Sequence, residues 1–112
     1  MAIEWESPIV FLLNSDFTFR VVMDSALTGK TVVFVVRKEP EDATAVYSVT
    51  SGITFATVDA VVDIAADIPI AASGTNSMEE GEYVAAVWRT DSSNQRPLAY
   101  GPILARRAAA PP

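Results

Sequence analysis

The side chains of this sequence with the clearest chemical potential are carboxylates. Asp59, Asp63 and Asp67 recur at every fourth position, which would align them on one face of a helix. Oxygen ligands gathered in this way are what Ca²⁺ prefers. On a strand, however, the three would span about 26 Å, which is too far for one ion. Solvated charges on an outer face explain the pattern better.

The other acidic clusters have the same interpretation. They lie in two polar segments, at Glu39-Glu41-Asp42 and at Glu79-Glu80-Glu82. Either cluster could bind a cation weakly, but we interpret both as solvated surface charges. A glycosidase-like pair of carboxylates has no support in the sequence. We therefore expect no metal site.

Most catalytic classes are excluded by residue type. The chain has no His and no Cys, so it lacks an imidazole base, a Ser-His-Asp triad, a thiol nucleophile and the usual zinc ligands. Gly29-Lys30-Thr31 lacks the upstream glycine of a phosphate-binding loop. No Gly-x-Ser-x-Gly motif is present. The sequence therefore predicts a protein that is not an enzyme and needs no cofactor.

Charge and hydropathy limit the partners. With 14 acidic and 8 basic residues, the net charge of −6 disfavours binding to nucleic acid through its phosphates. The opening residues are acidic where a secretory signal needs a basic region. The apolar run at 9–13 is far too short to span a bilayer. We expect a protein made in the cytoplasm that contacts neither nucleic acid nor membrane.

The residue composition favours strands over helices. The chain has 30 Val, Ile and Thr residues but only five Leu. Turn residues separate short segments with alternating or continuous apolar character. The predicted strands cover 9–13, 17–23, 30–38, 44–50, 53–58, 82–90 and 98–106. Ser51-Gly52 reads as a tight turn that joins two of them in a hairpin.

For residues 57–68, the sequence is compatible with either a helix or a strand. The Asp spacing suits a helix, whereas an unbroken apolar set at even positions suits a strand with an acidic outer face. Val and Ile content and Pro69 favour the strand. Pro102 lies within the last predicted strand and cannot donate to a ladder, so that strand is expected at an edge or at a bulge.

These patterns predict an all-β protein with a single domain. The expected architecture is one antiparallel β-sandwich, or a small barrel, of about seven or eight strands. An N-terminal arm covers 1–8, the sandwich covers 9–107, and a flexible Ala/Pro tail covers 108–112. Two strands, 30–38 and 82–90, are apolar on both faces, and self-association would cover the surplus apolar area.

Six residues are candidates for an interface between chains: Trp5, Ile9, Phe11, Trp88, Arg106 and Arg107. Trp5 lies in the N-terminal arm, which could pack on a neighbouring subunit. Trp88 could face a partner, although a core aromatic is the favoured reading. Arg106-Arg107 is the only basic cluster; it could meet an acidic partner, although capping of the last strand is favoured.

The order of these segments resembles small β-sandwich modules of tailed-phage virions. The matching pieces are Phe17-Thr18-Phe19-Arg20-Val21, Leu27-Thr28-Gly29-Lys30-Thr31-Val32, Gly52-Ile53, Gly81-Glu82-Tyr83 and Gly101-Pro102-Ile103-Leu104. They cover roughly residues 16–106. The resemblance implies a structural part without catalysis: a capsid decoration or cement protein, a baseplate component, or an adaptor at the base of a fibre.

Within the resemblance, the shortness of the chain favours a capsid cement or decoration protein. Such proteins are homotrimers that stabilise the shell, so the implied partners are other copies of this chain and the major capsid protein or other virion proteins. The implied location is the virion, assembled in the host cytoplasm. The alternatives are a baseplate or tail-fibre adaptor and, from a different class, a small carbohydrate-binding β-sandwich.

Overall fold

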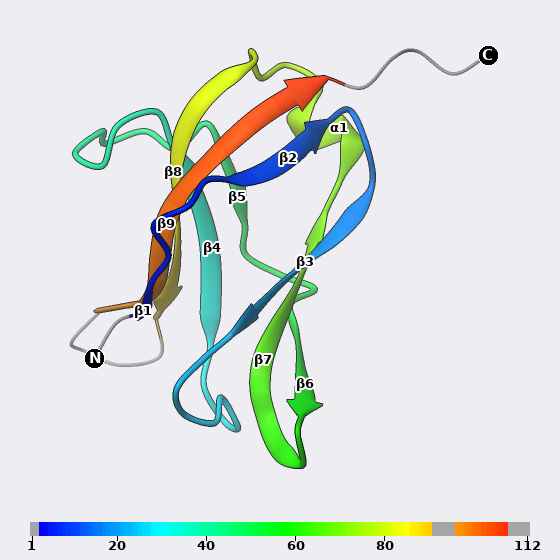
Figure 1. Cartoon of the computed structure of the whole chain (residues 1–112), viewed down its shortest axis with the longest axis vertical. Coiled ribbons are helices and arrows are strands. Elements are labelled where there is room, and N and C mark those ends of the chain that lie inside the picture. Colours follow the sequence, from blue (N-terminus) through cyan, green and yellow to red (C-terminus); the bar gives the residue numbers. More distant parts are fainter. Residues whose placement is uncertain (1–2, 91–95, 108–112) are drawn as a thin grey trace.

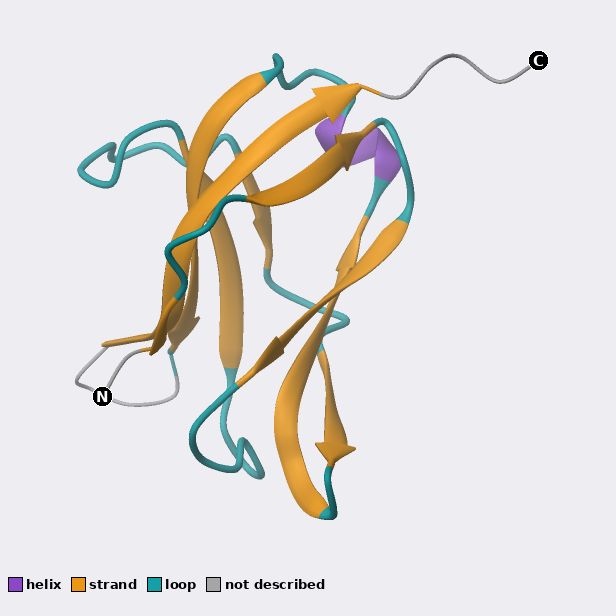
Figure 2. Cartoon of the chain, viewed as in Figure 1, coloured by secondary structure: helices purple, strands orange, loops and turns teal. Residues whose placement is uncertain are grey.

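The computed structural model describes residues 3–90 and 96–107, and it is almost entirely β. These residues form nine strands and a one-turn helix, arranged as two sheets (Figures 1 and 2). The elements are β1 (Ile3–Glu4), β2 (Ile9–Leu13), β3 (Phe17–Val22), β4 (Val32–Arg37), β5 (Tyr47–Val49), β6 (Thr54–Val58), β7 (Val61–Ile70), α1 (Ala72–Thr75), β8 (Gly81–Arg89) and β9 (Arg96–Arg107). The predicted all-β class is confirmed. The only described helix, α1, is far too short to cross a bilayer.

The first sheet is built around β9. Its strand order is β1-β9-β8-β4-β5, and β2 also pairs with β9, on the same side as β1. Both N-terminal strands run parallel to β9, whereas the other pairings are antiparallel. The sheet is therefore mixed rather than purely antiparallel, and the described chain has nine strands rather than seven or eight. The additional strand is β1, whose two residues are too few to show any periodicity in the sequence.

The second sheet has the order β3-β7-β6, with both pairings antiparallel. Residues 57–68 thus belong to two strands, not to a helix. Asp59 and Ala60 form the turn between them, and both have positive φ, 51° and 66°. Two successive residues with positive φ are the mark of a type I′ hairpin turn.

The predicted hairpin around Ser51-Gly52 is wrong. β5 pairs with β4 in the first sheet, whereas β6 pairs with β7 in the second. The segment between β5 and β6 therefore crosses from one sheet to the other. Gly52 does serve a bend there, with a φ of 80°.

The core lies between the two sheets and is centred on phenylalanines. Phe11 of β2 and Phe34 of β4 come from the first sheet and are almost fully buried. Phe17 and Phe19 of β3 come from the second sheet, and their rings lie 5.2 and 5.1 Å from that of Phe11 in edge-on contact. Such pairs add to the free energy gained from burial alone. The aromatic contacts therefore join the two sheets directly.

The expected N-terminal arm lies along β9 over its described residues, 3–8. The backbone N–H of Trp5 donates to the carbonyl of Tyr100, and its indole Nε1 donates to the carbonyl of Pro102 over 2.7 Å. The indole ring lies against Gly101, where a Cβ would overlap it. It also contacts the ring of Phe19 in edge-on geometry. Trp5 thus fills the space that the missing side chain at position 101 leaves open.

The strand that contains Pro102 was expected to lie at an edge or to carry a bulge. β9 has neighbours on both sides, and its pairing with β8 does carry a register shift, between Val87 and Trp88 and away from Pro102. The pairing with β1 ends at Tyr100 and the pairing with β2 begins at Ile103. Pro102 therefore falls in the interval between the two N-terminal strands, where a missing N–H leaves no ladder bond unmade. The carbonyl of Pro102 accepts a hydrogen bond from the indole N–H of Trp5.

The contact between Trp5 and Gly101 predicts a change of sign in a double-mutant cycle. Gly101→Ala alone should destabilise the fold by about 1–3 kcal/mol, because the new methyl group displaces the indole. In a Trp5→Ala background, the same substitution should be neutral or stabilising, because alanine is favoured over glycine within a strand. Urea denaturation of the four proteins measures the cycle. An equal cost of Gly101→Ala in both backgrounds would contradict this packing.

Candidate functional site: the outer face of the first sheet

The side of the first sheet that faces away from the core is largely apolar. On β8, Tyr83, Ala85 and Val87 are buried in the core, so their neighbours face outward. Val84, Ala86 and Trp88 are the outward residues, and all three are half-buried. Trp88 is therefore not the core aromatic that its strand position favoured. It lies on the surface side, because Val87 takes the inward position at the end of β8.

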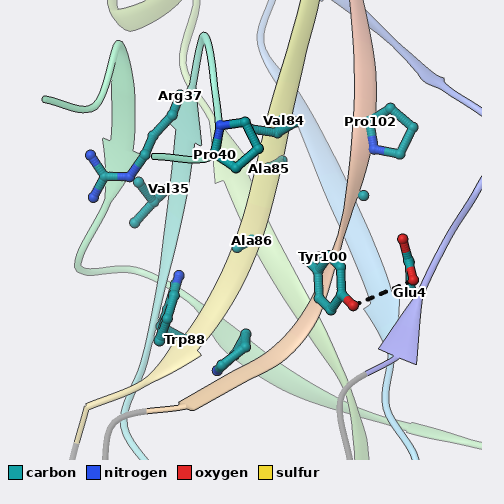
Figure 3. A pocket seen from close by; sticks show the side chains of 12 residues that line it. Glu4, Val35, Arg37, Pro40, Val84, Ala85, Ala86, Trp88, Tyr100 and Pro102 are labelled. Atoms are coloured by element: carbon teal, nitrogen blue, oxygen red, sulfur yellow. Dashed lines mark hydrogen bonds between the residues drawn. The ribbon is translucent and has the colours of Figure 1, made fainter. Parts of the chain in front are cut away.

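A hollow of ≈ 490 Å³ lies on this face, next to Trp88 and Tyr100 (Figure 3). Its lining comes from β1, β4, β8 and β9 and from the loop after β4. The residues that line it are Glu4, Val35, Arg37, Pro40, Val84, Ala85, Ala86, Trp88, Pro97, Tyr100, Gly101 and Pro102. Ala86 is small and lies between bulkier outward residues, so the surface is depressed there. Apolar and aromatic linings of this kind suit the docking of another molecule.

Polar groups lie at the margins of the hollow. On one side, the hydroxyl of Tyr100 donates to the carboxylate of Glu4 over 3.3 Å. On another, Arg37 carries a buried Nη1 that has no hydrogen-bond partner. A buried donor without a partner costs free energy, so this nitrogen is a strained point at the margin of the hollow. The site thus offers a half-buried apolar and aromatic surface with a few polar groups at its margin.

The apolar surface continues onto β2 in a way that the sequence did not reveal. Val10 and Leu12 are 55% and 44% exposed, whereas Phe11 and Leu13 between and beside them are buried. Val10 pairs with Leu104 of β9 and Leu12 pairs with Arg106. Because residues 9–13 are all apolar, the sequence does not show which of them face outward. The pairing of β2 with β9 determines this orientation.

The other candidate interface residues occupy different surroundings. Phe11 is part of the core, and Ile9 packs against the core while half-buried. Arg106 is exposed on the outer face beside Leu12. Arg107 holds the loop before β8: its Nη2 donates to the carbonyls of Asn76 and Met78, over 3.1 and 2.8 Å. Trp88 and Arg106 thus lie on the same face of the first sheet but toward opposite ends of β9, because Trp88 pairs with Pro97. Phe11 is turned away from that face.

The three regularly spaced aspartates do not converge. Asp59 lies in the hairpin turn, and Asp63 accepts a hydrogen bond from the hydroxyl of Thr28 over 2.8 Å. Asp67 forms a bidentate pair with Arg20 on the neighbouring strand, over 2.6 and 2.8 Å. Among the residues that the structure describes, no group of acidic side chains could hold a metal ion.

The Arg20–Asp67 pair displaces the pKa of the Asp67 carboxyl. The hydrogen bonds from Arg20 lower the pKa of the Asp67 carboxyl below its ordinary value of 3.8, and partial desolvation opposes them. The side chain of Arg20 is 51% exposed, so solvent screens this pair. It links β3 to β7 on the outer side of the second sheet, away from the hollow.

The lowered pKa of Asp67 predicts an acid-dependent loss of stability. Because the folded state keeps the carboxylate charged to lower pH than the unfolded state does, the pair contributes fully above 3.8 and is lost as the pH falls through the lower folded value. Asp67→Asn should therefore flatten the dependence of the unfolding free energy on pH below 3.8, as measured by urea denaturation. Asp59→Asn, in the exposed turn, is the control with the same change of charge and should leave that slope in place.

Comparison with known proteins does not identify the chain. No protein-family model matches the sequence, and no curated protein has significant similarity to it. Its function must therefore be argued from the residues on its surface.

Proposed function

We propose that this chain is a non-enzymatic structural protein of a bacteriophage virion, a capsid cement or decoration protein that self-associates and docks on the shell. The observation that carries the docking role is the outer face of the first sheet, with Trp88 and Tyr100 beside an apolar hollow. Aromatic side chains that are only half-buried offer a large contact area at a low cost in conformational entropy. The order of sequence segments shared with small virion sandwiches supports the same role.

Two sheets that pack around one core support a β-sandwich architecture, which suits such a role. The strand orders β9-β8-β4-β5 and β3-β7-β6 correspond to strands G-F-C-C′ and B-E-D of immunoglobulin-type sandwiches. These are stable scaffolds that present binding surfaces on a sheet face, at an edge or on loops. The architecture alone assigns no function, because many unrelated functions share it. The docking proposal therefore rests on the outer face and not on the fold.

Two alternatives use the same face. A baseplate or tail-fibre adaptor would dock there on another tail protein. A carbohydrate-binding sandwich would stack sugar rings on Trp88 and Tyr100, whereas Tyr83 is buried and Trp5 and Tyr47 pack against the core. Two outward aromatics beside a hollow favour this second alternative over a hydrolase, which would need converging polar groups.

The docking proposal predicts that Trp88 is required for binding to capsid shells. The purified chain is mixed with purified shells of tailed phages that lack their decoration proteins, and bound protein is measured by co-sedimentation. Wild type should co-sediment with at least one kind of shell. Trp88→Ser should lose at least tenfold in affinity, because it removes a large apolar contact.

Val62→Ser is the matched control, since Val62 is 61% exposed on β7 in the second sheet. It should bind as the wild type does. Equal binding by Trp88→Ser and wild type would contradict the role of the outer face. Failure to bind any shell, together with Trp88-dependent binding to an array of glycans, would replace the capsid role with carbohydrate binding.

A further inference from the structure

One edge of the first sheet is open. β2 pairs with β9 on one side, and no described strand pairs with its other side. An edge strand of this kind presents a row of backbone N–H and C=O groups that only another strand can pair in full. The free backbone groups of this edge are therefore suited to pairing with an extended segment of protein and not to binding a small ligand.

This edge lacks the features that normally prevent pairing between molecules. The other edge strands of the described chain are very short, as β5 is with three residues, or carry a register shift, as β6 does, or bear a charge, as β3 does at Arg20. β2 has five uncharged apolar residues and pairs with β9 without any register shift. Its outward side chains, Val10 and Leu12, are about half exposed. An uncharged, regular and apolar edge is a template for association.

We propose that β2 pairs in antiparallel orientation with β2 of a second copy, across a two-fold axis near Phe11. Centred there, Val10 of each copy lies opposite Leu12 of the other, so that the exposed apolar residues cover one another. The contact is isologous, with the same patch on both sides. The two first sheets would then run on as one sheet of about ten strands, which is within the usual range.

The charges permit this contact despite the net charge of −6. β2 itself carries no charge, and the charged residue beside it on the outer face is Arg106, next to Leu12. In the pair, the two Arg106 residues lie on the two β9 strands, three strand spacings or about 14 Å apart. That separation exceeds the Debye length of about 8 Å at physiological ionic strength, so their repulsion is weak.

This inference deepens the self-association in the proposed function, and it changes the number of copies. The virion resemblance implies three copies, whereas pairing of β2 with itself closes at two. It leaves the outer face around Trp88 free to dock elsewhere. Dimer formation and shell binding are therefore separate properties that can fail separately.

The test is the solution mass of the full chain, measured by light scattering over a dilution series. Wild type should show about 24 kDa, twice the 12.0 kDa of one chain. Leu12→Lys should raise the dissociation constant by about 100-fold, because each copy loses an apolar contact and brings a charge to the pairing edge. Val62→Lys places the same charge on an exposed valine of the second sheet and should remain a dimer. Circular dichroism establishes that each variant is folded, and Val10→Lys replaces Leu12→Lys if the latter is not.

Amide hydrogen exchange adds a backbone readout. In the dimer, amides of residues 9–13 should exchange more slowly than in the Lys variant, because pairing protects those that face the edge. A monomer at all concentrations would overturn the proposed pairing and the self-association alike. A mass of about 36 kDa, three times one chain, would overturn the β2 pairing while leaving self-association in place. A dimer that Leu12→Lys leaves intact would also overturn it.

Discussion

The contact of Phe11 with the phenylalanines of β3 and β4 is the interaction on which the rest of the structure depends. Phe11 comes from an edge strand of the first sheet, yet its ring contacts Phe17 and Phe19 of the second sheet and Phe34 at the centre of the first. An edge strand is normally the least well held part of a sheet. Here it is anchored through its side chain in the core, and its outward residues and free backbone edge are consequently held in fixed positions at the surface.

A second constraint comes from small residues where β9 passes the N-terminal segment. Gly101 leaves room for the ring of Trp5, and Pro102 lacks an N–H at a position where neither N-terminal strand pairs with β9. The N-terminal strands can therefore lie on β9 in two short pieces. This arrangement places the half-buried indole on the core side of β9 and leaves Tyr100 and Pro102 on the outer side, beside the hollow. The packing of Trp5 thus supports the same face that we propose for docking.

The sequence predicted the strands well where polarity alternates or where a run is bounded by charge, as at 17–23 and 30–38. It did not predict which strands pair, because pairing depends on partners that are distant in the sequence. Ser51-Gly52 has the composition of a hairpin turn but lies on a crossing between sheets, whereas the true hairpin turn, at Asp59-Ala60, contains no glycine. The prediction that Trp88 lies in the core was wrong for a related reason. When a strand is apolar on both faces, its sequence does not show which face points inward.

The resemblance to virion sandwiches concerns the scaffold of this protein and not its choice of partner. Its pieces coincide with requirements of the fold: Leu27 is buried, Gly29 and Gly52 have positive φ, and Tyr83 is buried with its hydroxyl donating to the carbonyl of Glu79. Such residues would recur in any protein that shares the architecture, whatever its partner. In the docking and self-association that we propose, partner choice depends instead on outward residues such as Trp88 and Leu12, which none of the shared pieces contains. Because neither side chain belongs to the core between the two sheets, substitutions at these two positions can test docking and self-association once each variant is shown to be folded.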